Sequence, residues 1–202
     1  MRRLSTIVGM GLMLVSPPLR AQSPSPAAFG ACVTCHGPDF EAAPLPQGSP
    51  PIPRVGGQHA EYIAKQLREY KAGKRKNDVM TAMTAKLPDR QLRELAAHLA
   101  SLAPARPAAE NSPLVERGRA LYDQGNASVP ACVGCHLSGA LGAPRYPRLA
   151  GQRQAYIAQQ LKNFKQGVRT NDRARVMRNI AANLSDEDIA ALAEYLSQLS
   201  GM

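Results

Sequence analysis

The sequence predicts an all-α protein built from two tandem helical domains. Two observations carry this prediction: apolar residues recur with helical spacing, and the same pattern occurs twice along the chain. Residues 53–78 match residues 147–172 at an offset of 94, with 14 of 26 positions identical. After three extra residues in the second copy, residues 79–102 match residues 176–199 at 9 of 24 positions. Such self-similarity indicates a duplicated structural unit, and neither copy shows the alternating pattern of a strand.

The first 21 residues have the composition of a secretory signal peptide. Two arginines precede an apolar run from Leu4 to Val15, and Ala21 is a candidate cleavage position. The run is too short to span a bilayer comfortably, and a retained amphipathic anchor is the alternative. We therefore expect a signal peptide at 1–21, a first domain at 22–103, a linker rich in proline and alanine at 104–112, and a second domain at 113–202.

Each copy is expected to contain two amphipathic helices. Gly73 and Gly167 follow the first helix of each copy, where a glycine can adopt the left-handed conformation that ends helices. Ser185 followed by Asp188 resembles a capping box at the start of the last helix. The stripes are Tyr62, Ile63, Gln66, Leu67 and Tyr70, with their equivalents Tyr156, Ile157, Gln160, Leu161 and Phe164, and then Leu92, Leu95, Leu99 and Leu102, with their equivalents Ile189, Leu192, Leu196 and Leu199.

The two copies differ at their N-terminal ends. The family resemblance described below implies a helix before each motif; residues 114–122 offer one in the second copy, with Gly118 placed to meet Tyr195 in the last helix. In the first copy only ten residues separate Ala21 from Cys32, so the corresponding helix is expected to be nearly absent. His98 stands where the second copy has its tyrosine.

All four cysteines of the chain lie in two Cys-x-x-Cys-His motifs. Zinc, a thioredoxin-type redox pair and disulfides are the alternatives. However, the pairs lie 100 residues apart, no strand precedes either, and plain disulfides leave the histidine unexplained. In the c-type haem attachment motif, two thiols form thioethers with one porphyrin and the histidine binds its iron. We therefore predict two covalent haem c groups, on Cys32 and Cys35 and on Cys132 and Cys135, with His36 and His136 as iron ligands.

The sixth iron ligands are expected to be methionines. Met80 and Met177 occupy equivalent positions in the two copies, and methionine is a known partner of histidine on haem iron. Met83 has no methionine opposite it, so we expect it to fill the core. Two histidines also lack an equivalent in the other copy: His59 is expected at the surface and His98 in the core.

With these motifs in place, the sequence resembles the di-haem class I cytochromes c, of the cytochrome c4 type. The resemblance covers residues 27–200 and is carried by CVTCHG and CVGCH, PRVGGQ and PRLAGQ, GKRKND and GVRTND, and the VM segments before LPD and LSDED. It implies two cytochrome c-like domains in pseudo-twofold relation, each wrapped around one haem, with propionates near the interface. It also implies that the carbonyls of Pro50 and Pro144 accept hydrogen bonds from the proximal histidines.

A haem iron with histidine and methionine ligands has no open position and exchanges single electrons. The sequence therefore predicts an electron carrier and not an enzyme. The resemblance places it in the bacterial periplasm, delivering electrons to a terminal oxidase. Its expected partners are a membrane oxidase, a quinol–cytochrome c reductase or a dehydrogenase, and loose membrane association stays open. The alternative is a fixed subunit of a dehydrogenase or oxidase complex; a di-haem peroxidase is disfavoured, because it would have to lose one methionine ligand.

Composition narrows the expected partners. The net charge is +10, and +7 without Arg2, Arg3 and Arg20. Because the basic residues form no block interleaved with aromatic residues, nucleic acid is not an expected partner. The chain has six Tyr, three Phe and no Trp, so each small domain has little apolar area to bury. We expect a haem to fill the centre of each domain.

Overall fold

The computed structural model describes residues 26–42, 49–107 and 112–200, which are largely helical. The predicted signal peptide and part of the predicted linker lie outside these residues. The described part contains one isolated bridge, Ala143–Tyr146, and no strand, so the all-α prediction is confirmed. The helices are α1 Pro26–His36, α2 Ala60–Lys71, α3 Asp78–Ala85, α4 Asp89–Ser101, α5 Pro113–Gln124, α6 Val133–His136, η1 Ser138–Ala140, α7 Gln154–Lys165, η2 Arg173–Arg175, α8 Val176–Ala182 and α9 Asp186–Gln198.

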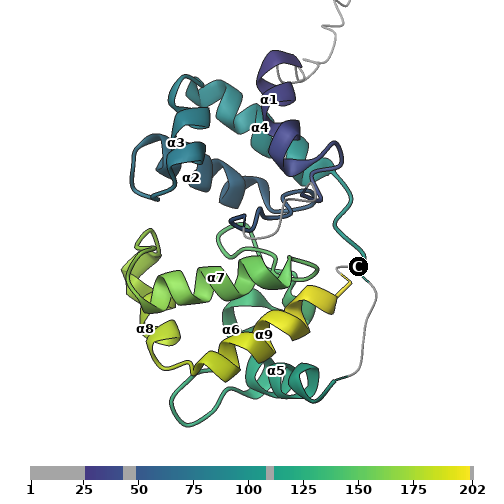
Figure 1. The fold of residues 1–202 in the computed structure, drawn as a ribbon, viewed down its shortest axis with the longest axis vertical. Helices are drawn as coiled ribbons and strands as arrows, with labels where there is room; N and C mark the ends of the chain where they lie inside the picture. Colours follow the sequence, from purple (N-terminus) through teal and green to yellow (C-terminus); the bar gives the residue numbers. More distant parts are fainter. Residues whose placement is uncertain (1–25, 43–48, 108–111, 201–202) are drawn as a thin grey trace, which may run out of the picture.

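The helices form two lobes that follow the two copies of the repeat (Figure 1). In the first lobe α2 packs against α3 and α4, and in the second α7 packs in the same way against α8 and α9. Within the described residues, no helix has the length and apolar character that crossing a lipid bilayer requires. The domain boundaries drawn from the sequence stay a prediction.

The predicted helix ends form as expected. Gly73 and Gly167 have φ angles of 68° and 71°, and their amides donate to the carbonyls of Tyr70 and Phe164 at the helix ends. The start of α9 is a capping box, in which the Ser185 side chain accepts from the amide of Asp188 while the aspartate accepts from the serine amide. Short polar signals therefore set the ends of these helices.

In the second domain the N-terminal and C-terminal helices cross where the sequence predicts their contact. Helix α5 crosses α9 at Gly118, where an added Cβ would lie 2.2 Å from the carbonyl oxygen of Ala191. The rings of Tyr122 and Tyr195 lie beside the crossing, with 5.8 Å between their centroids. A larger residue at position 118 would force the two helices apart.

The N-terminal helix of the first domain is present, so the prediction that it is nearly absent is wrong. Helix α1 runs without a break from Pro26 through the first Cys-x-x-Cys-His motif. In the second domain Gly125 ends α5 with a φ of 69°, and a loop separates that helix from α6. The first copy lacks this loop, so the residues before Cys32 continue the helix that carries the motif. Phe29 on α1 then packs edge-to-face on His98, with the ring centroids 4.5 Å apart.

Reciprocal hydrogen bonds join the two domains. The side-chain amide of Gln58 pairs with the backbone of Arg148, donating over 2.9 Å and accepting over 2.9 Å. The side-chain amide of Gln152 pairs in the same way with the backbone of Arg54, with both bonds at 2.8 Å. Because Gln58 is equivalent to Gln152 and Arg54 to Arg148, the contact has the self-complementary form of a twofold interface.

His59 belongs to this interface, so its prediction as a surface residue is wrong. Its Nε2 lies 2.9 Å from the carbonyl oxygen of Leu141 in the other domain. Its equivalent, Arg153, donates to the carbonyls of Glu41 and Ala42 in the first domain. Histidine and arginine can thus fill one role, because both present a nitrogen to a carbonyl across the interface.

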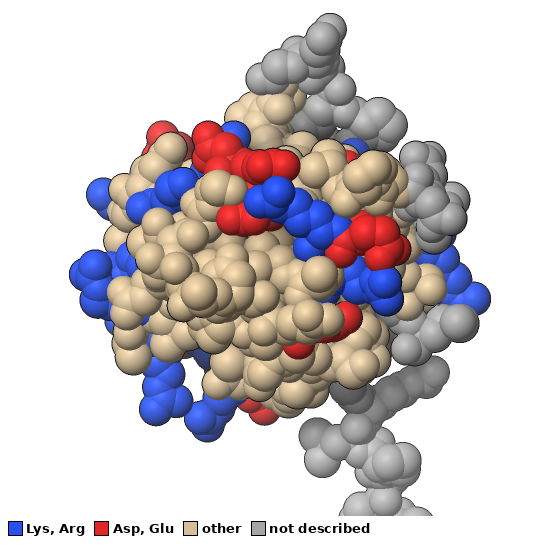
Figure 2. All heavy atoms as spheres, turned by 90° about the horizontal axis from the view of Figure 1, so that it is seen from below, with Lys and Arg blue, Asp and Glu red and all other residues tan. Residues whose placement is uncertain are grey.

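The outer end of the second domain carries charges of both signs. Figure 2, which faces that end, shows acidic and basic side chains interspersed with uncharged surface. Several of these charges pair locally: Arg117 with Glu187 at 2.8 Å and Arg119 with Glu116 at 2.5 Å. Exposed pairs of this kind contribute little to stability, roughly 0–1 kcal/mol each, and mainly solvate the helix faces.

Candidate haem-binding sites

The two motif histidines occupy equivalent positions. His36 is the last residue of α1 and His136 the last residue of α6. The Nδ1 atom of His36 lies 3.2 Å from the carbonyl oxygen of Pro53, and that of His136 lies 3.1 Å from the carbonyl oxygen of Pro147. A carbonyl oxygen can only accept, so Nδ1 carries the proton and Nε2 keeps its lone pair. That nitrogen is the one a metal ion would bind.

Both imidazoles are suited to be neutral ligands. Burial lowers the pKa of His36 and of His136, and this outweighs the hydrogen bond to each proline carbonyl, which raises it. A histidine whose pKa falls below its ordinary value near 6.5 is uncharged at neutral pH. Metal binding needs this uncharged form, so neither site has to lose a proton to take up iron near pH 7.

The carbonyl acceptors differ from those implied by the family resemblance. Pro50 and Pro144 were the expected acceptors, but the bonds go to the prolines three residues later. Pro144 lies at the tip of a tight turn, in which Ala143 and Tyr146 each donate to the other's carbonyl over 2.8 Å, and it is exposed. Pro50 is also exposed.

Cys32 and Cys132 do not have the character of redox-active thiols. Burial raises the pKa of Cys132 to about 11, and burial together with Cys35 raises the pKa of Cys32. A redox or nucleophilic cysteine needs the opposite shift, because the thiolate is the reactive form. The structure therefore favours attachment chemistry over the thioredoxin-type alternative.

The candidate distal methionines lie on two short helices. Met80 is half-buried on α3, which packs against α2; Met177 is half-buried on α8, which packs against α7 and the core of the second domain. Met83 is 38% exposed, so the prediction that it fills the core is wrong. It lies one helical turn beyond Met80 and points outward from the same helix. Iron ligation by Met80 and Met177 stays a prediction.

Arg148 shows that the second site fits the acidic edge of a haem. Its Nε and Nη1 atoms are buried and have no hydrogen-bond partner. Burial lowers the pKa of Arg148, and no neighbouring acid offsets the effect. The Nε of its equivalent, Arg54, is also buried without a hydrogen bond, but it lies 3.2 Å from a carboxylate oxygen of Glu41. Leaving buried guanidinium nitrogens without a partner is costly, and a haem propionate is a carboxylate that would supply one to Arg148.

Sequence reasoning missed Pro53, Pro147 and Arg148, although a signal for them was present. All three lie in the PR dipeptides that open the repeated stretches 53–78 and 147–172. The segment from the motif histidine to this proline spans 17 residues in the first copy and 11 in the second, yet both bonds end on the repeat-equivalent proline. Pro50 and Pro144 are related by the same offset of 94, so the repeat alone does not choose between the two pairs of prolines.

Two helical domains, each with a Cys-x-x-Cys-His motif and a neutral histidine held by a carbonyl, define a c-type cytochrome with two covalent haems. The family model described as "Cytochrome c" matches residues 26–103 and again residues 115–200. The chain belongs to the cytochrome c family, and within it to the di-haem cytochromes c4. Its function in this class is electron transfer.

The relatives agree with this assignment. Cytochrome c4 of Thiocapsa roseopersicina is 41% identical over 181 residues, covering 86% of this chain and 89% of the relative. A thiosulfate dehydrogenase electron acceptor of Thiomonas intermedia is 34% identical over 208 residues, covering 98% of this chain and 91% of the relative. Among solved structures, reduced recombinant cytochrome c4 from Pseudomonas stutzeri superposes with a TM-score of 0.78 at 35% identity, covering 88% of this chain and 100% of that one.

Proposed function

We propose that this chain is a periplasmic carrier that passes single electrons between respiratory-chain partners through two haems, towards a terminal oxidase. The observation that carries the proposal is the pair of neutral histidines, each with Nδ1 held by a proline carbonyl and Nε2 left to bind iron. Bound haem supplies one-electron redox chemistry. The predicted signal peptide supports export to the periplasm. Covalently attached haem and membership of the cytochromes c4 agree with that location.

The residues of this chain would hold each haem in a fixed environment. Cys32 and Cys35 would anchor the first haem and Cys132 and Cys135 the second, while Met80 and Met177 would complete the iron ligands. Arg148 would hold a propionate of the second haem. Reciprocal hydrogen bonds between the domains keep the two sites at one separation, so electrons can pass between them without domain rearrangement.

Replacing the methionines tests this ligand set. Met80→Ala should remove the sulfur-to-iron charge-transfer band of one haem and lower its potential, because methionine favours reduced iron. Met177→Ala should do the same for the other haem, and Met83→Ala should leave both bands in place. Loss of a band in Met83→Ala instead would place the ligand one helical turn further on. Carbon monoxide should bind the two ligand-loss variants and not the parent protein.

Two distinct one-electron waves are expected in spectroelectrochemical titration. His36 is half-buried, whereas His136 is only 8% exposed, so the first site has more solvent access. Solvent stabilises the more charged, oxidised iron, and the haem on Cys32 and Cys35 should therefore have the lower potential. If Met177→Ala shifts the lower wave and leaves the higher one unchanged, this assignment is reversed.

A second candidate function is favoured by one relative. Because the Thiomonas intermedia homologue is named an electron acceptor of thiosulfate dehydrogenase, this chain could serve as the acceptor of a periplasmic dehydrogenase. The two functions separate in one assay, in which the oxidised protein is mixed with thiosulfate and a thiosulfate dehydrogenase, and the reduced protein with oxidase-containing membranes. Rapid reduction in the first mixture supports the acceptor, and rapid oxidation in the second supports the carrier.

A further inference from the structure

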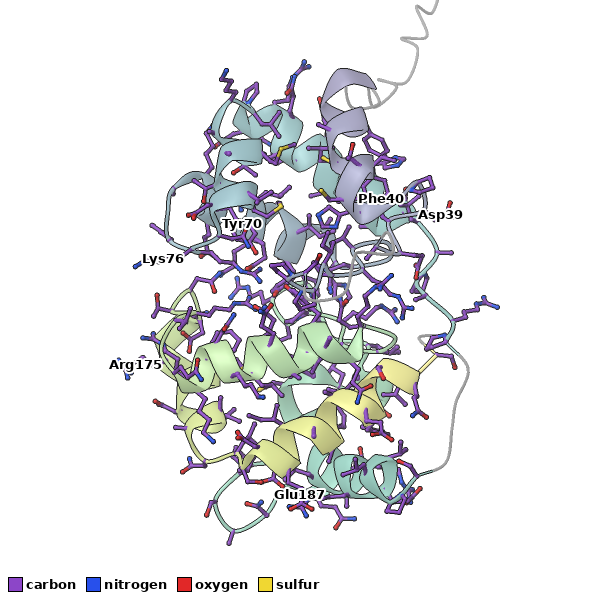
Figure 3. The ribbon with its side chains drawn as sticks, in the orientation of Figure 1. Asp39, Phe40, Tyr70, Lys76, Arg175 and Glu187 are labelled. Atoms are coloured by element: carbon purple, nitrogen blue, oxygen red, sulfur yellow. The ribbon has the colours of Figure 1, made fainter. Side chains whose placement is uncertain are left out.

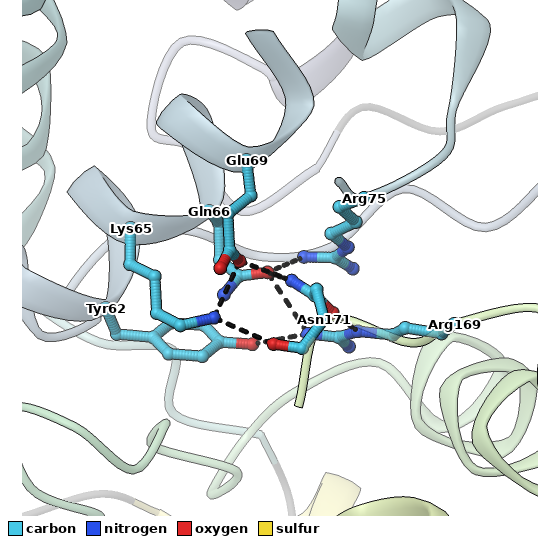
Figure 4. A network of polar contacts seen from close by, with 7 residues as sticks. All are labelled: Tyr62, Lys65, Gln66, Glu69, Arg75, Arg169 and Asn171. Atoms are coloured by element: carbon cyan, nitrogen blue, oxygen red, sulfur yellow. Dashed lines mark hydrogen bonds and ion pairs between the residues drawn. The ribbon is translucent and has the colours of Figure 1, made fainter. Parts of the chain in front are cut away.

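A polar network at the domain interface is built around two equivalent arginines (Figure 4). Arg75, which is 6% exposed, donates to the hydroxyl of Tyr156 at 2.8 Å and to Gln160 at 3.0 Å. Arg169 donates to the equivalent hydroxyl of Tyr62 at 3.0 Å and to Gln66 at 3.1 Å. This part of the network obeys the twofold relation between the domains.

One part of the network has no symmetric counterpart. The side chain of Asn171 donates to Glu69 at 2.6 Å and to Gln66 at 2.9 Å, and its backbone carbonyl accepts from Lys65 at 2.9 Å. Lys65 in turn lies 2.6 Å from Glu69. Lys65, Gln66 and Glu69 all come from α2, so three side chains of one helix in the first domain form hydrogen bonds with a single residue of the second domain. We call these four residues the Asn171 clamp.

The other side of the interface is built differently. The equivalents of Lys65 and Glu69 are Gln159 and Asn163, whose side chains make no hydrogen bond among the described residues. Asn77, the equivalent of Asn171, instead caps α3 within its own domain, where its Oδ1 accepts from the amide of Met80 at 2.9 Å. The same Asn-Asp dipeptide therefore has two different roles.

The three extra residues of the second copy explain the difference. They form η2, in which Ala174 and Arg175 take left-handed φ angles of 50° and 59°. Arg175 precedes α8 and gives no side-chain cap. Asp172, next to Asn171, caps the helix from a distance: its carboxylate accepts from the Arg178 amide at 3.0 Å and from Nε of the same residue at 2.7 Å.

We propose that the Asn171 clamp is a positioning device for the haem site of the second domain. Lys65 and Glu69 fix Asn171 across the interface, Asn171 fixes Asp172, and Asp172 fixes the start of α8. Met177 lies in the first turn of that helix, so the first domain controls how firmly it is held. The helix that carries Met80 is instead capped within its own domain, by Asn77. The link to the haem rests on the proposed ligation by Met177.

Equivalent alanine substitutions in α2 and α7 test the clamp in the haem-loaded, full-length protein. Glu69→Ala removes a charge-assisted partner of Asn171, and Asn163→Ala is the matched control. Hydrogen–deuterium exchange should become at least about tenfold faster in residues 171–182 of Glu69→Ala, as expected for loss of such a bond, and stay unchanged in residues 77–85. The control should alter neither segment.

The absorption spectrum and the redox potentials of the two haems supply a second measure. If Glu69 only stabilised the fold, its loss would not change one haem and spare the other. In Glu69→Ala the sulfur-to-iron band of the second haem should weaken and its potential should fall, while the first haem stays as in the parent protein. Faster exchange in 171–182 with an unchanged band would show that the clamp holds this segment without positioning the haem site, and would overturn the proposal; ligation by Met177 is tested separately by Met177→Ala. Unchanged exchange in 171–182, or an equal rise in both segments, would overturn the clamp. Should Glu69→Ala fail to fold, Lys65→Met removes the hydrogen bond to the backbone carbonyl of Asn171, and Gln159→Met is its matched control.

Discussion

The two domains hold their histidines in the same way but build their cores differently. In the second domain α5 crosses α9 at Gly118, and Tyr122 beneath the crossing is fully buried. In the first domain the N-terminal helix ends in the haem motif itself, and Phe29 covers His98 and Phe40. The larger buried cluster lies in the second domain. Figure 3 shows Phe40 close to the end of α1, and its side chain is 1% exposed.

This difference separates what the haem site requires from what the rest of the domain can vary. Both sites need an imidazole fixed by a carbonyl, and the His36–Pro53 and His136–Pro147 bonds agree within 0.1 Å. The N-terminal helix only has to cover the site, and an aromatic contact can replace a close helix crossing. The first domain should consequently depend more on its haem for stability than the second does.

Loss of one haem at a time gives the largest expected contrast between the domains. Replacing Cys32 and Cys35 by alanine should abolish protease resistance of the first half, because its small buried cluster cannot replace the haem. Replacing Cys132 and Cys135 should leave the second half partly resistant. Limited proteolysis with mass spectrometry measures both, and equal sensitivity of the two halves would contradict the comparison. A protein without either haem should not unfold cooperatively.

Alanine substitutions at two helical glycines should act in opposite directions. Gly118→Ala places a Cβ against the backbone of Ala191 and should destabilise the second domain by about 1–3 kcal/mol. Gly30→Ala in α1 meets nothing within 4 Å and should stabilise the first domain by about 0.5–1 kcal/mol, since alanine favours helix. Denaturant unfolding of each variant checks both signs, and a neutral Gly118→Ala would show that the crossing can widen freely.

At low pH the second domain should lose stability that comes from the carboxyl group of Asp188, whereas the first domain has no carboxyl group at the equivalent position. Burial raises the pKa of Asp188, but hydrogen bonds from Arg117 and Ser185 outweigh it and hold the pKa below its ordinary value. A depressed carboxyl pKa adds stability above the unfolded pKa, near 3.9, and the gain is lost as the pH falls through the folded pKa. Asp188→Asn should remove this part of the pH dependence. The equivalent residue in the first domain, Gln91, does not titrate, so a Gln91→Glu variant is the control for added charge.

The residue after each motif histidine gives the smallest expected effect. Gly37 has a φ of 77° and Leu137 a φ of 63°, a region that favours glycine. Gly37→Ala should destabilise the first domain by about 1 kcal/mol. Leu137→Gly should stabilise the second domain by less than about 1 kcal/mol, because relief of strain is partly offset by the greater freedom of the unfolded chain. Thermal unfolding at a fixed pH detects both changes, and a destabilised Leu137→Gly would mean that its half-exposed side chain makes a needed contact.

The sequence by itself determined the class of fold and the nature of the cofactor. Helical periodicity, Gly73 and Gly167 at helix ends, and the Ser185–Asp188 capping box depend on neighbours within a few residues, so they can be read along the chain. The Cys-x-x-Cys-His motif is equally local, because one helical turn sets the spacing of its thiols. The duplication then assigned equivalent positions in the two domains, and the family resemblance predicted the Gly118 crossing.

Only the tertiary structure decided how those local elements are used. The carbonyls of Pro53 and Pro147, rather than those of Pro50 and Pro144, lie beside the histidine rings. His59 became an interface residue, and Asn171 a bridge where Asn77 is a cap, through contacts with residues more than 80 positions away. The two buried, unpartnered nitrogens of the Arg148 guanidinium likewise exist only once the chain has folded around them. Such pairings depend on the path of the whole chain, which no short stretch of sequence encodes.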